Sequence, residues 1–486
     1  MNHEEQVGKN FAWTSLSQFV TRLFGLGFFI YMSHVLLEKG MGQYSFITTF
    51  TTFWFILSDF GISSYLYREW SKGNVLIEKI QEDFNVVLTL KLLMAACVFL
   101  PFVVINWFIN SEILWPLILY YAFIVLSMFI SHADIYLHSI NNFKFSAIRE
   151  LLEKTIVIIV GGIALLFLKN VISIFIAMIV AQIVSLLYYF KGRFPFRPRY
   201  AVNLVRMKFL IRKGLPFVLF AVFISIYGRI DMDMLRYMKN FETVGWYGAG
   251  YKAYEIANIF PGVLFLPAIF PVLSRIYNEK NRETYKNFFN RAIRILFSTS
   301  ILLSIFFVFL APYLISFLFP TSFAPSVLAM RIIILVLTIS SLSVLFANTI
   351  IIQNKEMLSL KIVVISTIIN VVLNLILIPR YSLYGAATAT VIAEACNLYM
   401  LQHYVDWDKE RTTLLKIGGT TMIVVLSLFY IRHVGYINNL YVGFGYILVL
   451  SVILWMLKLI EKDDLNMFYI PIKNKIAFIL FNKNSI

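Results

Sequence analysis

The chain has little charge and almost no cysteine. Only 14% of its 486 residues are Asp, Glu, Lys or Arg, against roughly 25% in soluble domains. Its two cysteines, Cys97 and Cys396, lie in apolar segments, so no disulfide framework or thiolate metal site is implied. A glycine-rich phosphate loop, a nucleophile elbow and a carboxylate pair at catalytic spacing are also missing. These absences argue against a soluble protein and an enzyme, and we expect no catalytic residue, resident metal or cofactor.

Long apolar runs make up most of the chain. Hydrophobic residues account for 60% of it and aromatic residues for 17%. About 20 apolar residues in a helix cross hydrocarbon roughly 30 Å thick. Fourteen runs are long enough, namely 11–37, 41–66, 84–109, 114–137, 152–168, 171–190, 214–235, 244–272, 292–318, 326–351, 358–379, 383–405, 412–432 and 437–460. The predicted fold class is therefore an all-α membrane protein with about 14 transmembrane helices.

The cations are distributed unevenly around these runs. If the N-terminus is cytoplasmic, 31 of the 42 Lys and Arg residues fall in cytoplasmic loops and six in external loops. Such a bias predicts that both termini are cytoplasmic. The net charge of +16 is then mostly a signal of topology and does not favour a nucleic-acid partner. The external loops are too short to hold a catalytic domain outside the membrane.

A short motif occurs twice at equivalent places. MGQYSF (41–46) opens the second run and VGWYGA (244–249) opens the eighth, and each follows a run that carries an arginine, Arg22 or Arg229. Because the copies are six spans apart and six is even, the two halves have the same orientation in the membrane. The predicted domains are an N-terminal six-helix lobe (1–190), a basic cytoplasmic linker (191–213), a C-terminal six-helix lobe (214–405), two additional transmembrane helices (406–460) and a cytoplasmic tail (461–486). The tail lies at the membrane interface or is a frayed terminus.

Five stretches carry a family resemblance. In chain order they are SQFVTRLFGLGFFIYMSHVLLEKGMGQYSF, LSDFGISSYLYRE, KGLPFVLFAVFISIYGRIDMDML, VGWYGAGYKAYEIANIFPGVLFLPAIFPVLSR and NVVLNLILIPRYSLYGAATATVIAE. In this order they resemble the polysaccharide and O-antigen flippase branch of the multidrug/oligosaccharidyl-lipid/polysaccharide exporter superfamily. The resemblance implies two pseudo-symmetric six-helix lobes around a central cavity that opens alternately to each side of the membrane.

The same resemblance implies what the protein handles and where. It implies a polyprenyl-diphosphate-linked oligosaccharide as cargo, moved from the cytoplasmic to the outer leaflet for cell-surface polysaccharide biosynthesis. Membrane lipids, a coupling ion (H⁺ or Na⁺) and polysaccharide polymerase or assembly proteins are the further partners. The implied location is the cytoplasmic (inner) membrane of a bacterium or archaeon.

Ionisable residues inside the apolar runs are candidate functional residues, because each costs roughly 2.5–3.5 kcal/mol to insert and normally faces a cavity or a partner. At 1.5 Å per residue, Arg22, Glu255 and Glu394 lie about 17 Å deep and Lys252 about 12 Å deep. Lys252 and Glu255 are spaced i, i+3 and can share one helix face. Gln18 lies one turn before Arg22. The four charged residues form a predicted central set near the middle of the membrane.

A second charged cluster, RIDMDML (229–235), lies in the outer third of the seventh run, about 22–28 Å from its inner end. Arg229 and Asp233 are i, i+4 neighbours, whereas Asp231 projects to another side. Two interpretations are open. Either Arg229 and Asp233 neutralise each other while Asp231 reaches water, or Arg229 contacts an anion at the outer mouth of the cavity with an acid tuning it.

These positions lead to a hypothesis about cargo handling. Arg22 and Lys252 contact the diphosphate or acidic sugars, and Arg229 assists them on the outer side. Hydrogen bonds to sugar hydroxyls are assigned to three amide residues, Gln18, Asn370 and Asn374. Coupling to an ion gradient is assigned to three acids, Glu255, Glu394 and Asp231.

Two other functions remain open from the sequence. A multidrug exporter of the same superfamily would share the architecture but carry organic cations, which a cationic central set disfavours. A non-transporting scaffold of an envelope-assembly complex would gain nothing from the cost of burying charge in the membrane.

Other polar or helix-breaking residues have simpler interpretations. Asp59 and Asp134 are predicted to be mainly structural residues near the cytoplasmic surface, and Lys91 is expected to extend its ammonium group to that surface. Pro261 and Pro271, with Pro267 between them, predict a kink in the eighth span.

Overall fold

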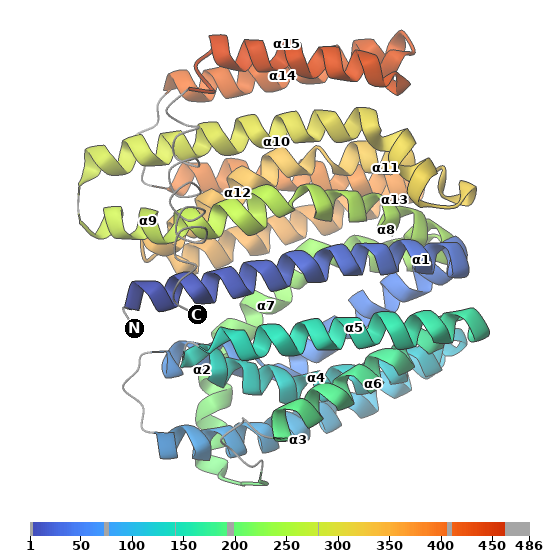
Figure 1. Ribbon diagram of the computed structural model, residues 1–486, viewed down its shortest axis with the longest axis vertical. Coiled ribbons are helices and arrows are strands. Elements are labelled where there is room, and N and C mark those ends of the chain that lie inside the picture. Colours follow the sequence, from blue (N-terminus) through green and yellow to red (C-terminus); the bar gives the residue numbers. More distant parts are fainter. Residues whose placement is uncertain are drawn as a thin grey trace, which may run out of the picture. The chain divides into compact units, whose positions relative to one another are not determined.

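The computed structural model describes residues 3–71, 77–140, 142–191, 199–279, 281–405 and 411–461. These residues form helices and no strand (Figure 1), which confirms the predicted all-α class. The first half contains α1 (His3–Asp59), α2 (Ile62–Trp70), α3 (Ile77–Ile109), η1 (Ser111–Ile113), α4 (Leu114–Ser139), α5 (Phe143–Leu168) and α6 (Val171–Phe190). The second half contains α7 (Leu204–Met238), α8 (Phe241–Ala257), η2 (Ile259–Phe265), α9 (Leu266–Asn278), α10 (Arg282–Leu318), η3 (Thr321–Phe323), α11 (Ser326–Ile333), α12 (Val336–Ile352), α13 (Glu356–Tyr404), α14 (Arg411–His433), η4 (Tyr436–Asn438) and α15 (Leu440–Met456). Most of the predicted tail, from residue 462 on, lies outside the described residues.

The described part of the chain has 10 helical segments long and apolar enough to cross a membrane. Two of them hold two predicted spans each, because α1 is kinked at Leu37 (φ 54°) and α13 at Ser382 (φ 54°). Both kinks lie at or within one residue of the predicted gaps between spans. The two remaining predicted spans correspond to α8–η2–α9 and to the shorter apolar helix α15.

The predicted break in the eighth span is present. α8 ends at Ala257, the wider π-helical turn η2 follows, and α9 begins at Leu266. Pro261 lies inside η2 and cannot donate a backbone hydrogen bond to the turn before it. Proline therefore widens this helix locally, and π-type turns are a recognised cause of bends within helices.

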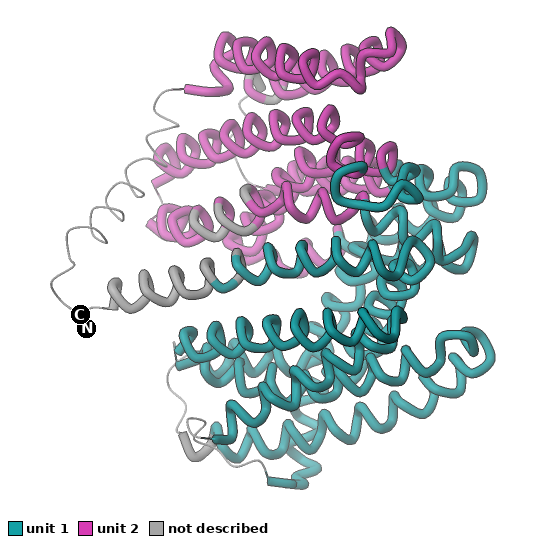
Figure 2. Tube along the Cα trace, turned by 45° about the vertical axis from the view of Figure 1, so that its right-hand side comes forward, with its two compact units in different colours: residues 1–249, 316–326, 363–389 teal, residues 250–315, 327–362, 390–486 magenta. Residues whose placement is uncertain are grey.

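The chain divides into two compact units (Figure 2). Unit 1 comprises residues 1–249, 316–326 and 363–389, and unit 2 comprises residues 250–315, 327–362 and 390–486. The division passes through α8, α10, α11 and α13. The two six-helix lobes expected from the sequence remain a prediction.

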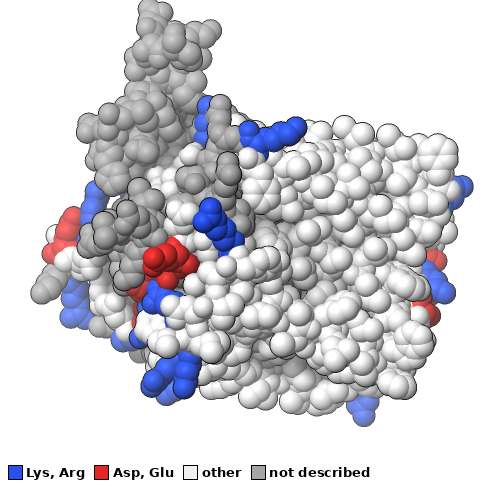
Figure 3. Space-filling view, turned by 90° about the horizontal axis from the view of Figure 1, so that it is seen from below, with Lys and Arg blue, Asp and Glu red and all other residues white. Residues whose placement is uncertain are grey.

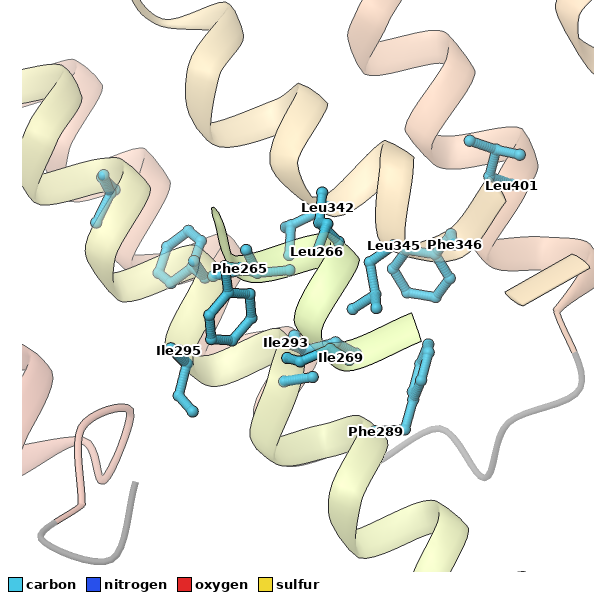
Figure 4. Close-up of a cluster of buried hydrophobic side chains, with 14 of the residues drawn as sticks. Phe265, Leu266, Ile269, Phe289, Ile293, Ile295, Leu342, Leu345, Phe346 and Leu401 are labelled. Atoms are coloured by element: carbon cyan, nitrogen blue, oxygen red, sulfur yellow. The ribbon is translucent and has the colours of Figure 1, made fainter. Parts of the chain in front are cut away.

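Each unit has its own apolar core. In unit 1, residues such as Leu66, Val87 and Leu210 connect α2, α3 and α7. In unit 2, side chains from η2, α9, α10, α12 and α13 converge, and Phe289 and Phe346 meet edge to face with ring centroids 5.4 Å apart (Figure 4). Lipid tails are as apolar as these side chains, so in a bilayer such cores stabilise the units mainly through van der Waals contact.

The two copies of the repeated motif contact each other within unit 1. A Cβ placed on Gly42 would collide with the carbonyl oxygen of Phe241, and a Cβ on Gly245 would collide with the carbonyl oxygen of Glu38. Gly42 and Gly245 are equivalent positions of the repeat, and so are Glu38 and Phe241. The contact is therefore reciprocal, as expected where two related elements cross at a pseudo-two-fold axis. Glycine is required at both positions because only hydrogen fits against the facing backbone.

The hairpin of α14 and α15 packs on α10 within unit 2 (Figure 1). Phe309 of α10 fills the space beside Gly443, where a Cβ would overlap its ring. Arg331 of α11 holds the turn of the hairpin, because its guanidinium donates to the carbonyl oxygen of Ile437 at 3.0 Å and to the side chain of Asn438 at 2.7 Å. Arg331 also donates to the carbonyl oxygen of Val308 in α10 at 3.0 Å.

Replacing Arg331 by methionine should lower the free energy of unfolding by about 1–3 kcal/mol, because three acceptors lose a charged donor. The measurement is thermal melting in detergent together with hydrogen exchange at the turn around Tyr436. Arg432→Met is the matched control, since Arg432 is exposed near the same turn. Equal effects of the two substitutions would contradict the anchoring role of Arg331.

Charged side chains are segregated on the face drawn in Figure 3. Lys, Arg, Asp and Glu gather toward one end and along the opposite edge, and a broad uncharged area lies between them. Many large apolar side chains are strongly exposed, including Phe108 (81%), Phe167 (80%) and Phe317 (84%). An uncharged surface of exposed aromatic and aliphatic residues is what hydrocarbon contact requires, which agrees with a multi-pass membrane protein.

Candidate functional site

Unit 1 contains a cavity of about 380 Å³ that Arg229 helps to line. Three helices contribute to it: α1, α4 and α7. Its lining consists of Thr48, Thr49, Thr52, Phe53, Tyr120, Ser225 and Arg229. Six of these seven side chains carry a hydroxyl or guanidinium group. The volume lies at the small end of the roughly 300–1,000 Å³ typical of ligand pockets.

The threonine hydroxyls donate their protons to the helix that carries them. Thr49 donates to the carbonyl oxygen of Ser45 at 2.8 Å, and Thr52 donates to that of Thr48 at 2.6 Å. Thr48 donates to the carbonyl oxygen of Tyr44 at 2.9 Å. A hydroxyl has one proton and two lone pairs, so the three oxygens keep acceptor capacity. The threonine wall of the cavity therefore favours ligand groups that donate hydrogen bonds.

Arg229 supplies donors and positive charge to the same cavity. Its side chain is exposed rather than enclosed, and it lies within electrostatic reach of the Tyr120 ring, which lies next to Thr52. Guanidinium groups carry five N–H donors and no acceptor. The cavity thus combines an anion-binding group with hydroxyl acceptors, a pairing that suits a ligand with both negative charge and hydroxyl groups.

The acids after Arg229 are buried, which corrects one of the interpretations of this cluster. Asp231 is 4% exposed and accepts hydrogen bonds from the hydroxyl of Tyr247 and from the backbone N–H of Met232, so it does not reach water. Asp233 is also 4% exposed, and neither of its oxygens has a hydrogen-bond partner in the described residues. The predicted mutual neutralisation of Arg229 and Asp233 is therefore wrong. Asp233 is a buried carboxyl group that the sequence analysis had treated only as a partner for Arg229.

The predicted acids of unit 2 lie around one tyrosine. Lys252 and Glu255 form an ion pair at 2.6 Å, and both side chains are a little over a quarter exposed. Tyr254 is close to Glu255 and to Glu394, and its hydroxyl lies 3.1 Å from that of Ser340. The structure therefore brings Lys252, Glu255 and Glu394 into one neighbourhood of unit 2, and the central set of four charged residues near the middle of the membrane stays a prediction. Because Glu255 already compensates its charge, Lys252 is a weaker anion contact than an unpaired lysine would be.

The two predicted asparagines bind each other. Asn370 and Asn374 of α13 are buried, and the amide group of Asn374 donates to the side-chain oxygen of Asn370 at 3.0 Å. The side-chain oxygen of Asn374 has no partner among the described residues. Nearby, Thr367 donates to the carbonyl oxygen of Phe223 at 3.2 Å and ties α13 to α7. These asparagines do not line the cavity of Arg229, and their role toward sugar remains a prediction.

Arg22 belongs to unit 1. It is exposed on α1, and within the described part of the chain no hydrogen bond or ion pair holds it. It does not line the cavity of Arg229. The side chain of Gln18, its predicted partner on the helix, lies outside the described residues.

Two ion-pair networks of unit 1 are structural. Lys91 is 1% exposed, and its ammonium lies 2.7 Å from Asp59 and 2.6 Å from the hydroxyl of Ser63. The prediction that Lys91 extends to the surface is therefore wrong, because Asp59 on the neighbouring helix satisfies it inside. Asp134 accepts from Arg149 at 3.1 Å and also from Tyr189. Both acids join helices, as their structural interpretation predicted.

The threonines of the cavity were missed by the sequence analysis. They belong to the stretch ITTFTTFWF (47–55), in which two adjacent pairs of threonines are three residues apart inside an apolar run, so that Thr48 and Thr52 are spaced i, i+4. This spacing places several hydroxyls on one helix face. The threonine spacing could be seen in the sequence. However, the same spacing occurs where threonines bond only to their own helix, and only the packing of α1 against α4 and α7 shows that these threonines line a cavity.

Comparison with protein families identifies the class. A family model described as "Polysaccharide biosynthesis protein" matches residues 7–277, which is more than half of the chain. The chain belongs to this family. A second model, MatE, matches residues 216–376. The protein is thus a multi-pass transporter of the multidrug/oligosaccharidyl-lipid/polysaccharide exporter superfamily, similar to lipid flippases and to multidrug exporters. No curated protein matches the chain in sequence.

Solved structures of that superfamily share the fold. The lipid II flippase MurJ in an inward closed conformation aligns with a TM-score of 0.70 and 17% identity, covering 94% of this chain and 99% of its own. An inward-facing multidrug resistance transporter of the MATE family aligns with a TM-score of 0.64 and 15% identity, and the alignment covers 82% of this chain and 95% of that transporter. A superfamily transporter from Pyrococcus furiosus aligns with a TM-score of 0.58 and 16% identity, and the alignment covers 85% of this chain and 95% of that transporter. That transporter is described as having a binding pocket of reverse polarity. At these identities the likeness concerns the fold alone.

Proposed function

We propose that the protein is a flippase that moves a polyprenyl-diphosphate-linked oligosaccharide from the cytoplasmic to the outer leaflet by alternating access, for cell-surface polysaccharide biosynthesis. The supporting observation is the cavity of Arg229 with its three threonines. Such a cargo has a diphosphate, many hydroxyl groups and a long apolar tail. Its polar part loses hydration in hydrocarbon, and replacement hydrogen bonds must come from the protein.

The cavity meets both chemical needs of this polar part. Arg229 attracts the diphosphate or an acidic sugar through charge-assisted hydrogen bonds. Thr48, Thr49 and Thr52 have given their protons to backbone carbonyl groups, so they accept from sugar hydroxyls. The small volume fits one or two sugar units at a time, while the tail stays in lipid. Arg22 and Lys252 are proposed as further anion contacts, and Gln18, Asn370 and Asn374 as sugar contacts.

Coupling to an ion gradient is part of the proposal. Asp231 and Asp233 are buried acids on α7, the helix that also carries Arg229. Glu255 and Glu394 flank Tyr254 in unit 2. A buried carboxyl group without a charged partner is more stable when neutral, so uptake of H⁺ or Na⁺ at Asp233, whose oxygens have no hydrogen-bond partner among the described residues, changes its local charge. Conversion of Asp233 to asparagine should weaken the dependence of transport on the gradient while leaving exchange without a gradient intact.

The decisive experiment is transport by Arg229 variants. In proteoliposomes with a fluorescent polyprenyl-diphosphate-linked disaccharide, Arg229→Gln should reduce the flipping rate about ten- to a hundredfold, since a charged hydrogen bond contributes roughly 1.5–3 kcal/mol. Arg229→Lys should retain part of the rate because it keeps the charge but loses the planar group. Arg380→Gln is the control, because Arg380 is exposed and does not line the cavity. Equal flipping by wild type and Arg229→Gln would remove the cavity from the transport route.

A multidrug exporter is the second candidate. The match of residues 216–376 to MatE and the ring pair of Tyr251 and Tyr254, with centroids 5.4 Å apart beside two acids, favour a site for an organic cation. Expression in an exporter-deficient host discriminates between the two. Resistance to ethidium that is lost in Glu394→Gln would support the exporter, whereas no change in susceptibility together with accumulation of lipid-linked sugar in a deletion strain would support the flippase.

A further inference from the structure

The segment from Arg199 to Lys213 crosses one end of α3 with a fixed backbone. The backbone N–H of Arg199 donates to the side chain of Asn85 at 3.0 Å, and that of Ala201 donates to the hydroxyl of Thr89 at 3.0 Å. Arg206 forms a two-pronged ion pair with Asp83, with both contacts at 2.7 Å. Figure 1 shows the first turns of α7 lying beside α3. Since Asp83, Asn85 and Thr89 flank the start of the predicted span 84–109, the segment lies level with the membrane boundary.

Apolar side chains of this anchored segment point away from the protein. Its inward side is carried by Met207 and Leu210, which are buried. Its outward side has four strongly exposed apolar residues, namely Tyr200 (86%), Val202 (70%), Leu204 (75%) and Val205 (84%). Single exposed apolar residues are ordinary, but a contiguous group on a rigid backbone indicates an interaction surface.

Four exposed cations accompany these side chains: Arg199, Lys208, Arg212 and Lys213. Along α7, Leu204, Lys208 and Arg212 follow one another at four-residue spacing, so apolar and basic side chains share one face. The cations are distributed over several turns and do not converge on one point. This distribution fits a surface of many negative groups better than a single small ligand.

We propose that this segment, residues 199–213, is a docking site for acidic phospholipid headgroups of the leaflet on its side of the membrane. Tyr200, Val202, Leu204 and Val205 insert at the boundary between headgroups and acyl chains, and the four cations contact lipid phosphates. Asp83, Asn85 and Thr89 hold the segment at the height where both contacts form. The lipid then braces α7, which carries Arg229 at its other end. The surface is separate from the cavity, so its test does not depend on which cargo the protein moves.

The test measures lipid retention by the full chain with native mass spectrometry. Wild type is expected to retain phosphatidylglycerol in preference to phosphatidylcholine. The variant Arg199→Gln/Lys208→Gln/Arg212→Gln/Lys213→Gln should retain at least tenfold less phosphatidylglycerol, because one cation near an anionic surface contributes about fivefold. The control is Lys39→Gln/Lys169→Gln/Arg380→Gln/Arg432→Gln, which removes the same charge from exposed positions elsewhere. Unchanged melting in phosphatidylcholine nanodiscs checks that each variant is folded.

Four outcomes would overturn the proposal, the last of them with a replacement variant. If the charge variant retains as much phosphatidylglycerol as the wild type does, these cations do not bind lipid. If the control variant loses as much phosphatidylglycerol as the charge variant, retention follows the net charge of the protein. Displacement of phosphatidylglycerol by excess sodium pyrophosphate would assign the surface to a diphosphate. If the charge variant does not fold, Tyr200→Ser/Val205→Ser replaces it and should lower retention severalfold, whereas unchanged retention would contradict insertion of this segment.

Discussion

Replacing Lys91 by methionine should destabilise the protein by about 3–5 kcal/mol, because removal of one partner of a buried ion pair leaves an uncompensated charge. Lys91 is almost fully buried, and its ammonium is held by Asp59 at 2.7 Å and by Ser63 at 2.6 Å. Methionine fills a similar volume, so the effect isolates the charge from packing. The measurement is the melting temperature in detergent, which should fall strongly.

A double substitution separates this electrostatic cause from a simple loss of packing. Lys91→Met with Asp59→Asn removes both charges and should recover most of the lost stability, since apolar or neutral replacements of buried pairs are often tolerated. The control is Arg275→Met, which breaks an exposed pair of 3.7 Å with Glu279 and should change stability by less than about 1 kcal/mol. If the double variant melts as low as Lys91→Met alone, the charge of Asp59 is not the cause.

The second large effect concerns Gly42. Gly42→Ala should destabilise unit 1 by about 1–3 kcal/mol or more, because its Cβ has no room beside the backbone of Phe241. Gly245→Ala should have a similar effect, since Gly245 faces Glu38 in the same way. Folded yield from membranes and melting in detergent are the measurements. Transport should fall together with stability.

Gly25 provides a matched control on the same helix. A Cβ on Gly25 meets no atom within 4 Å, so Gly25→Ala should be neutral or stabilising, by up to about 1 kcal/mol from helix propensity. Gly25→Ala and Gly42→Ala each add one methyl group to α1, but Gly42→Ala is expected to lower the stability and Gly25→Ala to leave it unchanged or raise it. Destabilisation of equal size at Gly25 and Gly42 would show that the contact between the repeats does not limit packing.

The positions of the membrane spans could be predicted because they depend on local sequence. A span needs about 20 apolar residues wherever it lies in the chain, and the bilayer sets this length for all helices alike. The breaks at Leu37 and Ser382 fell at or beside the predicted gaps for this reason. The prolines of the eighth span predicted its interruption equally well, because a missing N–H acts on the turn directly before it.

The partners of the charged residues could not be predicted in the same way. The sequence placed Lys91 near a surface and Arg229 near Asp233, yet Lys91 pairs with Asp59 and Asp233 has no partner among the described residues. Pairing depends on how each helix is rotated about its axis and on which neighbour it meets. In lipid the outer and inner faces of a helix are both apolar, so hydrophobic periodicity gives little information about this rotation.

The sequence by itself therefore determined an all-α membrane protein, its approximate spans, its internal repeat and the arginine on α7, because these features follow from local composition and order. Only the tertiary structure decided that Thr48, Thr49 and Thr52 face Arg229 across a cavity, and that Glu255 neutralises Lys252. It also decided that the repeated glycines meet each other. These features arise from contacts between helices distant in sequence, where steric fit and the satisfaction of buried polar groups select one arrangement.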